Sequence, residues 1–187
     1  WNSKNIEYRK NSQFIELAKG ITNVFDMPSG SGTPVAVTFW RNSWSILWDV
    51  LVITNTGKIV TSAGVQHTLT NGSAVNIASA NGKRYIIGAA KLNEFVSYTS
   101  VTENIADFWG SQTIRPVLNF FGDLIIGDGN KILRYNEDAS VALYTAWATN
   151  GTIWGLEWTV YAITQVWVNV YVWCNDGTNT NLYIWDG

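Results

Sequence analysis

The stretch "GDLIIGDGNKILRYNED", residues 122–138, decides the fold of this chain. Two apolar runs, rich in β-branched residues, flank the short polar segment Gly-Asp-Gly-Asn. β-Branched and aromatic side chains favour strands, and Gly and Asn tolerate the positive φ angles that a tight hairpin turn demands. The stretch therefore predicts two antiparallel strands joined by a short turn.

The same pattern recurs along the chain, and an apolar run precedes each hairpin. The other hairpins are "DVLVITNTGKIVTS" (49–62), "KRYIIGAAKLNEFVSY" (83–98) and "NVYVWCNDGTNTNLYIWDG" (169–187). The preceding runs are "PVAVTFW" (34–40), "AVNIASA" (74–80), "RPVLNFF" (115–121) and "TVYAITQVW" (159–167). Three or four strands per repeat predict an all-β array of about four antiparallel units. Positive φ is also expected in the turns "ANGK" (80–83) and "TNGS" (70–73).

The N-terminal part has a different character. Residues 1–32 are mostly polar and lead into "PSGSGTP" (28–34), a composition typical of linkers. We therefore divide the chain into an N-terminal segment, 1–32, and a repeat domain, 33–187. Within the segment, "SQFIELAKG" (12–20) has apolar residues at a spacing that suits a short helix and a Gly that could end it. The same stretch fits a strand equally well.

Composition excludes several classes of partner. Only 14% of the 187 residues are charged, well below the ~25% typical of soluble domains. The net charge of -2 offers no basic surface for nucleic acid and no polybasic patch for a membrane. The longest apolar stretches, such as 45–54, fall short of the ~20 residues that a spanning helix needs. We expect no nucleic-acid partner and no membrane insertion.

Low charge with many small polar residues is common in secreted and virion β proteins. This composition favours an extracellular, virion or cell-surface location.

The chain has few of the residues that usually carry catalysis or bind metals. His67 is the only histidine and Cys174 the only cysteine, which excludes a site with several His ligands and an internal disulfide. No Gly-x-Ser-x-Gly nucleophile motif occurs. We predict a structural role for His67, a buried strand position for Cys174, and a protein without catalytic residues, metal or cofactor.

Acidic and amide side chains permit two other interpretations. A pair of carboxylates can hydrolyse glycosides, and the candidates are Asp123, Asp128, Glu137, Asp138 and Glu157. Oxygen ligands can bind calcium, and the candidates are Asp128, Asn130, Asn175, Asp176, Asn179 and Asn181. Neither calcium cluster, at residues 127–130 or at residues 174–181, has the ligand spacing of an EF-hand. Turn and surface roles account for both sets, and these are the roles that we predict.

Tryptophan is the unusual feature of the composition. The chain has 11 Trp residues, several of them grouped near residues 40–48, 147–158 and 167–185. Large aromatic side chains often fill the space between packed sheets, where each buries ~150–250 Å². When exposed, they stack on sugars or anchor a protein partner. Both roles remain open for each Trp.

The last hairpin gives the most specific prediction. We expect residues 170–174 and 181–185 to pair around a polar loop, 175–180, with the tight bend at Asp176-Gly177. Alternation places Val166, Val168, Val170 and Val172 on one face of the first strand, and Trp167, Asn169, Tyr171 and Trp173 on the other. We expect Leu182 and Ile184 to share the core face, and Tyr183 and Trp185 the neighbour-facing side. The candidate binding residues are Trp167, Tyr171, Trp173, Asp176, Asn179, Tyr183 and Trp185.

Two segments, "LNFFGDLIIGDGNKILRYNED" (118–138) and "VYVWCNDGTNTNLYIWDG" (170–187), resemble blades of β-propeller proteins. The resemblance covers residues 33–187 and is to the propeller-like proteins of bacteriophage tails and virions and to surface lectins. The Gly-His and Trp-Asp pairs of WD40 blades do not recur at a constant period, and the kelch di-glycine is missing. The resemblance implies a propeller-like array, part of a larger ring or of a longer chain.

The function expected from this resemblance is structural. It implies a non-enzymatic structural or attachment protein of a virion or cell surface that acts through contacts with other protein chains, copies of itself or surface components. A lectin-type module that binds glycans is the alternative. A glycan-active hydrolase is a third hypothesis. It depends on the carboxylates of Asp123, Asp128, Glu137, Asp138 and Glu157.

Overall fold

The computed structural model describes residues 5–8, 15–18, 25–40, 49–97, 99–108, 110–135, 144–145, 156 and 158–185. All regular structure in this part of the chain is β, in agreement with the prediction of an all-β protein. The described residues therefore contain no helix that is long and apolar enough to cross a membrane.

Strands β1 (Asn5–Tyr8) and β2 (Ile15–Ala18) form an antiparallel hairpin. The stretch that suited either a helix or a strand is thus a strand over its described residues.

Four sheets follow in chain order. The first sheet contains β3 (Pro34–Trp40), β4 (Asp49–Thr54), β5 (Lys58–Thr61) and β6 (Gly64–Thr68). The second contains β7 (Asn76–Ala80), β8 (Lys83–Ile87), β9 (Lys91–Ser97) and β10 (Ser100–Asp107). The third contains β11 (Val117–Phe120), β12 (Asp123–Asp128), β13 (Lys131–Tyr135) and β14 (Tyr144–Thr145). The last contains β15 (Thr159–Val166), β16 (Asn169–Asn175) and β17 (Thr180–Trp185).

Within every sheet, each strand pairs antiparallel with the strand that follows it in sequence. The glycines of the predicted turns adopt positive φ: 73° at Gly57, 75° at Gly82, 59° at Gly129 and 99° at Gly177. At Gly57 a Cβ atom would also lie 3.1 Å from the Leu69 Cβ atom. Glycine is therefore required there for both its conformation and its size.

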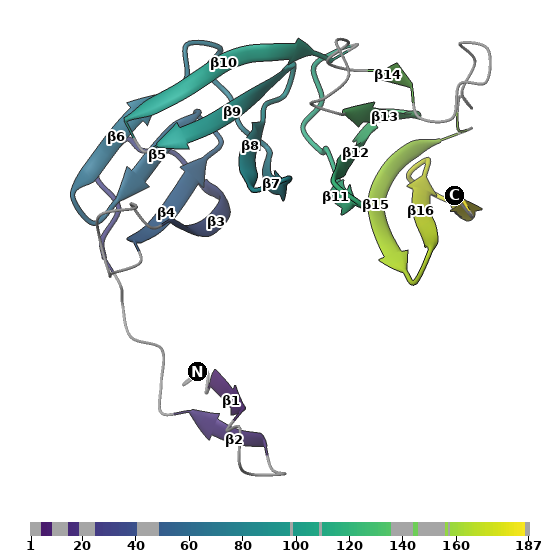
Figure 1. The fold of residues 1–187 in the computed structure, drawn as a ribbon, viewed down its shortest axis with the longest axis horizontal. Helices are drawn as coiled ribbons and strands as arrows, with labels where there is room; N and C mark the ends of the chain where they lie inside the picture. Colours follow the sequence, from purple (N-terminus) through teal and green to yellow (C-terminus); the bar gives the residue numbers. More distant parts are fainter. Residues whose placement is uncertain are drawn as a thin grey trace.

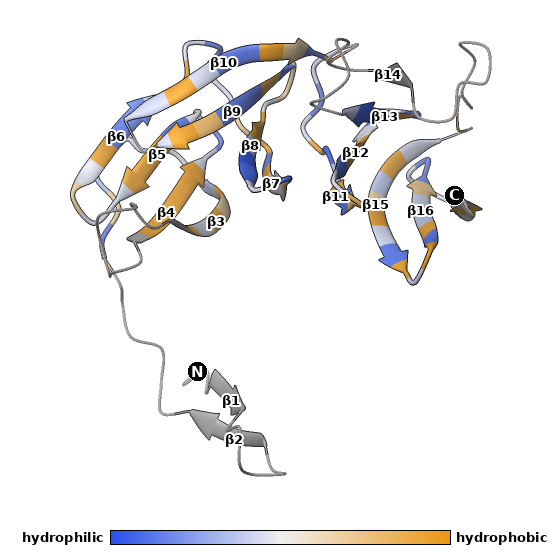
Figure 2. Ribbon diagram, in the orientation of Figure 1, coloured by the Kyte–Doolittle hydropathy of each residue, from blue (hydrophilic) through white to orange (hydrophobic). Residues whose placement is uncertain are grey.

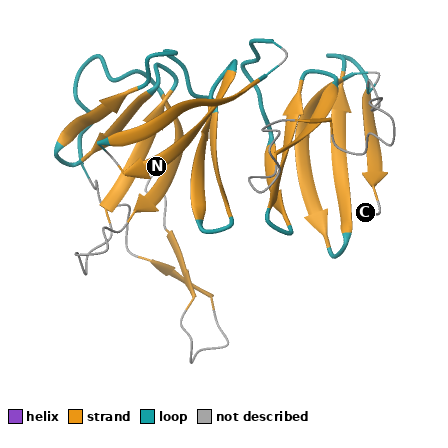
Figure 3. Cartoon of the chain, turned by 45° about the horizontal axis from the view of Figure 1, so that its top comes forward, coloured by secondary structure: helices purple, strands orange, loops and turns teal. Residues whose placement is uncertain are grey.

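The four sheets stand side by side in chain order (Figure 1). The first strand of each sheet contacts the first strand of the next, so that β3 meets β7, β7 meets β11, and β11 meets β15. Figure 3 shows the same succession from a second direction, with the first and last sheets at opposite ends of the row. The first strands thus form the common inner side of the array.

Three separate cores lie between the sheets, one at each junction. Leu51, Ile53 and Ile59 of the first sheet pack with Ile86 and Phe95 of the second. The second junction joins Tyr85, Ile87 and Leu92 to Leu124, Ile126, Leu133 and Tyr135. The third joins Phe120, Ile125 and Ile132 to Val160, Val170, Val172 and Cys174. Apolar residues recur along the strands of all four sheets in Figure 2, because each inner sheet supplies one face to the junction before it and the other to the junction after it.

Candidate functional site

The last sheet has one face in the core and one face that is exposed. Trp173 pairs with Ala162 on one side and Leu182 on the other, and Tyr171 pairs with Ile184. These five side chains share a face of the sheet, since paired residues point the same way. Trp173 is 49% exposed, Leu182 55% and Ile184 60%. We call Ala162, Tyr171, Trp173, Leu182 and Ile184 the terminal face, and it is the candidate functional site.

The structure corrects the predicted orientation of β17. The strands pair as predicted, with Cys174 opposite Asn181, and one further pair, Asn175 opposite Thr180, shortens the predicted loop to residues 176–179. In this register Tyr183 lies opposite Val172 and packs against the third core, whereas Leu182 and Ile184 lie on the terminal face. The prediction that Leu182 and Ile184 face the core was therefore wrong. Residues paired across two strands share a face, so Leu182 must point with its partner Trp173, and the prediction assigned the face of each strand without this condition.

The backbone of Trp185 pairs with Val170, but its side chain lies outside the described residues. The predicted role of Trp185 at a neighbour-facing surface therefore stays a prediction. Among the candidate binding residues, Tyr171 and Trp173 are the two that the structure places on the terminal face.

Trp167 occupies a different position, at the tip of the β15–β16 hairpin. Val166 pairs with Asn169, so Trp167 and Val168 form the turn between the strands. Trp167 has a positive φ of 59° and is 89% exposed. The expectation that Val166 and Val168 share a face with Val170 and Val172 is wrong, because the turn ends the alternation, and both residues are exposed.

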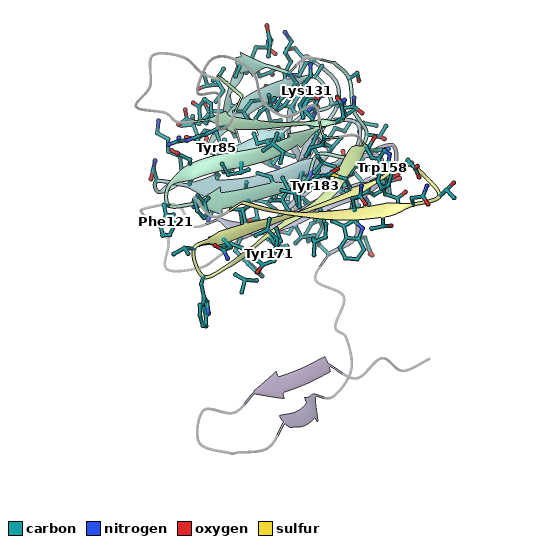
Figure 4. All side chains as sticks on the ribbon, turned by 90° about the vertical axis from the view of Figure 1, so that its right-hand side faces the viewer. Tyr85, Phe121, Lys131, Trp158, Tyr171 and Tyr183 are labelled. Atoms are coloured by element: carbon teal, nitrogen blue, oxygen red, sulfur yellow. The ribbon has the colours of Figure 1, made fainter. Side chains whose placement is uncertain are left out.

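The sequence interpretation missed a second aromatic residue of this kind, Phe121. It lies in the β11–β12 turn, with a φ of 50° and 76% of its surface exposed. Its side chain stands at the edge of the fold in Figure 4, whereas Tyr183 lies among the ribbons. Positive φ is unfavourable for a bulky residue. The following Gly122, with its own positive φ of 95°, is the signal that could have placed a turn here.

Asp176 and Asn179 lie in the loop at the opposite end of β16 from Trp167. One carboxylate oxygen of Asp176 accepts hydrogen bonds from the amides of Thr178, at 2.7 Å, and Asn179, at 2.6 Å. The other accepts a bond from the Asn179 side chain at 3.1 Å. These bonds, the Asn179 amide first among them, lower the pKa of Asp176. Both oxygens stabilise the loop itself, which supports the turn role predicted for this cluster.

The inner strands border an open hollow of about 370 Å³. It is lined by the start of β7, by the segment 113–117 and by residues 161–163. The side chains of Asn76, Thr113 and Tyr161 supply polar groups, and Asn76 already donates to the Arg115 carbonyl oxygen at 3.1 Å. No carboxylate, thiol or imidazole is among the described lining residues. The hydroxyl groups among its described lining residues are those of Thr113 and Tyr161.

Arg115 lies beside this hollow but is directed into the protein. Its side chain is fully buried, and Nη1 donates to Asp128 Oδ1 at 2.7 Å. Nε and Nη2 donate to the Ala89 carbonyl oxygen at 3.0 and 2.7 Å, and the guanidinium lies 3.9 Å from the centre of the Phe108 ring. Burial lowers the pKa of Arg115, and the Asp128 carboxylate opposes that effect. This network joins the second sheet to the third.

The remaining carboxylates give little support to a catalytic pair. Asp123 forms an ion pair with Arg134, and Asp128 is held by Arg115. Glu137, Asp138 and Glu157 lie outside the described residues. Within the described part of the chain, no three His, Cys, Asp or Glu side chains gather to hold a metal ion.

His67 lies at the contact between the first two sheets. Its Nε2 atom is 3.3 Å from Oε1 of Glu103, whose carboxylate also accepts bonds from the amide and hydroxyl of Thr70. Burial raises the pKa of Glu103, but the bonds from Thr70 and His67 outweigh it, so the net pKa lies below the ordinary value. This geometry is consistent with the structural role predicted for His67.

Replacing Glu103 with Gln should therefore destabilise the protein most near neutral pH. A lowered folded-state pKa stabilises the fold above the unfolded pKa, and that stability is lost as pH falls through the folded pKa. We expect Glu103→Gln to cost about 1 kcal/mol at pH 7, the usual net value of a hydrogen bond. The difference in stability should shrink below about pH 4, where the wild-type carboxylate also becomes protonated.

Urea unfolding at pH 7 and below about pH 4 measures this difference. The control is Asp107→Asn, at an exposed carboxylate on the same strand. A difference independent of pH would contradict the prediction.

Cys174 is fully buried in β16, as predicted, and burial raises the pKa of its thiol to about 11. Since the thiolate is the reactive form, a disulfide reagent at pH 8 should modify the native protein at least about a hundredfold more slowly than the urea-unfolded chain. The release of the coloured thiolate from the reagent measures both rates. Equal rates would show that the third core does not protect this side chain.

No protein-family model matches the chain, and no curated protein matches it.

Proposed function

We propose that this protein is a non-enzymatic structural or attachment protein with a β-propeller-like array of sheets, and that it acts through protein-protein contacts at an extracellular, virion or cell surface. The observation that carries the proposal is the terminal face, where Trp173, Leu182 and Ile184 are exposed side by side. Scattered exposed apolar residues are normal in soluble proteins, whereas a contiguous group marks an interaction site.

The arrangement of the sheets supports the propeller-like part of the proposal. The sheets are antiparallel and follow one another in chain order. Their first strands are neighbours on the inner side, and an apolar core fills each junction. These features support the proposal, because propeller blades also succeed one another around an inner side, and their ring leaves only short and protected strand edges.

Immunogold electron microscopy with an antibody against this chain tests the attachment role. We expect label on particles, filaments or the outer surface of cells from its source. The matched control is the same antibody after adsorption on the purified protein. Label confined to material that is free of any particle, filament or surface layer would overturn the proposal.

A lectin-type module is a second candidate, because Trp167 and Phe121 stand exposed at hairpin tips. Exposed aromatic rings can stack on sugar rings, and uncharged polar residues such as Asn169 and Gln165 lie beside Trp167 in the chain. A glycan array should then detect a ligand whose binding is lost in Trp167→Ala and retained in Val96→Ala, a change at an exposed strand position. An array with no bound glycan would dismiss this candidate and leave the first unaffected.

A further inference from the structure

Three turns lie along one edge of the row of sheets. They join the first strand to the second in the second, third and fourth sheets, at residues 80–83, 120–123 and 166–169. The first two of these turns touch, since a Cβ atom on Gly122 would collide with Oδ1 of Asn81. Phe120, in the turn of the third sheet, belongs to the same core as Val170, which follows the turn of the fourth. Figure 3 shows these turns on one side of the row, and we call them the turn edge.

Each of these turns contains a residue with positive φ, but only one of the three residues is suited to it. The angle is 49° at Asn81, 50° at Phe121 and 59° at Trp167. Asn tolerates this conformation, and Asn81 followed by Gly82 is the pair that a two-residue hairpin turn prefers. A bulky aromatic residue is strained there. The second sheet thus shows what such a turn requires, and the aromatic residues of the third and fourth sheets do not meet that requirement.

Burial does not compensate for this strain. Trp167 is 89% exposed, between Val166 at 50% and Val168 at 59%. Phe121 is 76% exposed, and its ring meets the edge of the Phe120 ring with the centres 4.6 Å apart. A run of exposed apolar residues at a strained turn has its use in a contact outside the fold.

Amide side chains beside the two rings are bonded to the turns themselves. Nε2 of Gln165 donates to the Trp167 carbonyl oxygen at 2.6 Å. At the neighbouring turn, Oδ1 of Asn119 accepts a bond from the Gly122 amide at 3.0 Å, and Nδ2 donates to the Ser79 carbonyl oxygen at 2.7 Å. A sugar would need such side chains for its hydroxyl groups, whereas an apolar medium leaves these bonds in place.

Charge also bears on the partner. The strands of the fourth sheet contain no Asp, Glu, Lys or Arg. The charged residues of the three turns are Lys83 and Asp123, and each forms an ion pair, with Glu94 and Arg134 respectively. The turn edge can therefore approach an apolar medium without burying an unpaired charge from these turns, and it offers no excess of positive charge to an anionic surface.

We propose that the turn edge binds a zwitterionic lipid surface, with the Phe121 and Trp167 rings in the interfacial layer of the bilayer. Aromatic rings favour this layer, because it is apolar on one side and wet on the other. The contact is shallow and needs neither a spanning segment nor a basic patch, the two features whose absence led to the expectation of no membrane insertion. This inference rests on the attachment role in the proposed function and names a lipid surface as its partner.

Flotation of the 187-residue chain with phosphatidylcholine vesicles tests the inference. We expect the wild-type chain to float with the vesicles, and binding should not weaken between about 0.05 and 0.5 M salt, because the contact uses no charge. Trp167→Asn should lower the partition coefficient at least about tenfold, because the gain from removing the ring from water is lost. Phe121→Asn should lower it in the same direction, and Trp167→Phe should retain most of the binding.

Trp173→Thr is the matched control. It removes a half-exposed Trp further along β16, on the terminal face, and keeps a β-branched residue in the strand. This variant should bind vesicles like the wild type. Circular dichroism and urea unfolding should show that Trp167→Asn is folded, since the turn of the second sheet uses Asn at positive φ. A folded Trp167→Asn that binds like the wild type, or an equal loss in Trp173→Thr, would overturn the inference.

A wild-type chain that does not float would also overturn it, and a glycan ligand that is lost in Trp167→Asn would then assign the turn edge to sugars. Binding that requires anionic lipid and disappears at high salt would contradict the uncharged contact. The attachment role would survive each of these results, because its own test is the location of the label in electron micrographs. Conversely, vesicle binding without surface label would leave the lipid contact standing and remove the attachment role.

Discussion

Arg115→Ala is expected to lower the free energy of unfolding by about 3–5 kcal/mol, the cost of removing one member of a buried ion pair. The guanidinium is fully buried, and it neutralises Asp128, which is itself buried. Its removal takes the guanidinium away from that buried carboxylate, removes the Arg115 donor from the Gly110 carbonyl oxygen, and leaves the Ala89 carbonyl oxygen with the Gln112 amide as its donor. Urea unfolding followed by fluorescence measures the loss.

Arg134→Ala provides the matched control. Arg134 also pairs with an aspartate, Asp123, but its side chain reaches solvent. Asp123 is buried, but Arg134 is partly solvated, so the pair is only partly desolvated and this variant should lose less stability than Arg115→Ala. Arg115→Lys should recover part of the loss, because a single ammonium group cannot reproduce every bond of the planar guanidinium. If Arg115→Ala lowered the free energy of unfolding no more than Arg134→Ala, the Arg115 network would not stabilise the contact between the second and third sheets.

Ile86→Ala is expected to cost about 2–5 kcal/mol, the range for removing a large side chain from a packed core. Ile86 is fully buried at the first junction, where it packs with Ile53, Ile59 and Phe95. The loss combines the transfer of the missing methylene groups with the cavity that they leave. Val96→Thr, an exposed change on the same sheet that keeps a β-branched residue, should alter stability by only about 0.5 kcal/mol. A cost below about 1 kcal/mol for Ile86→Ala would mean that the neighbouring sheets collapse freely into the space.

Local sequence signals predicted most of the strands. Turn glycines such as Gly129 and Gly177 combine a conformational requirement with their place between apolar runs, so the hairpins could be located from neighbouring residues alone. The fourth strands were harder to recognise. In β6, "GVQHT", polar residues outnumber apolar ones, and β10 contains an irregularity near Asn104, which has a positive φ of 59°.

The candidate site was predicted less well, because it depends on register and on contacts between distant parts of the chain. Tyr171 and Trp173 were placed correctly on the terminal face, but Leu182 and Tyr183 were assigned from the alternation within their own strand and not from their partners Trp173 and Val172. The Arg115–Asp128 pair links the segment before β11 to the end of β12. No local pattern marks that pair, since its energy comes from burial that only the assembled sheets create.

Because each sheet packs only on its neighbours, the stability of this row grows by one junction for each added sheet, as in a linear array of repeats. Each of the two middle sheets packs on a neighbouring sheet at both faces, and each of the two end sheets does so at one face. Fluctuations that open the structure should therefore begin at the ends, where fewer contacts must be broken. The length of the row thus determines both how strongly its centre is protected and how readily its outer units open.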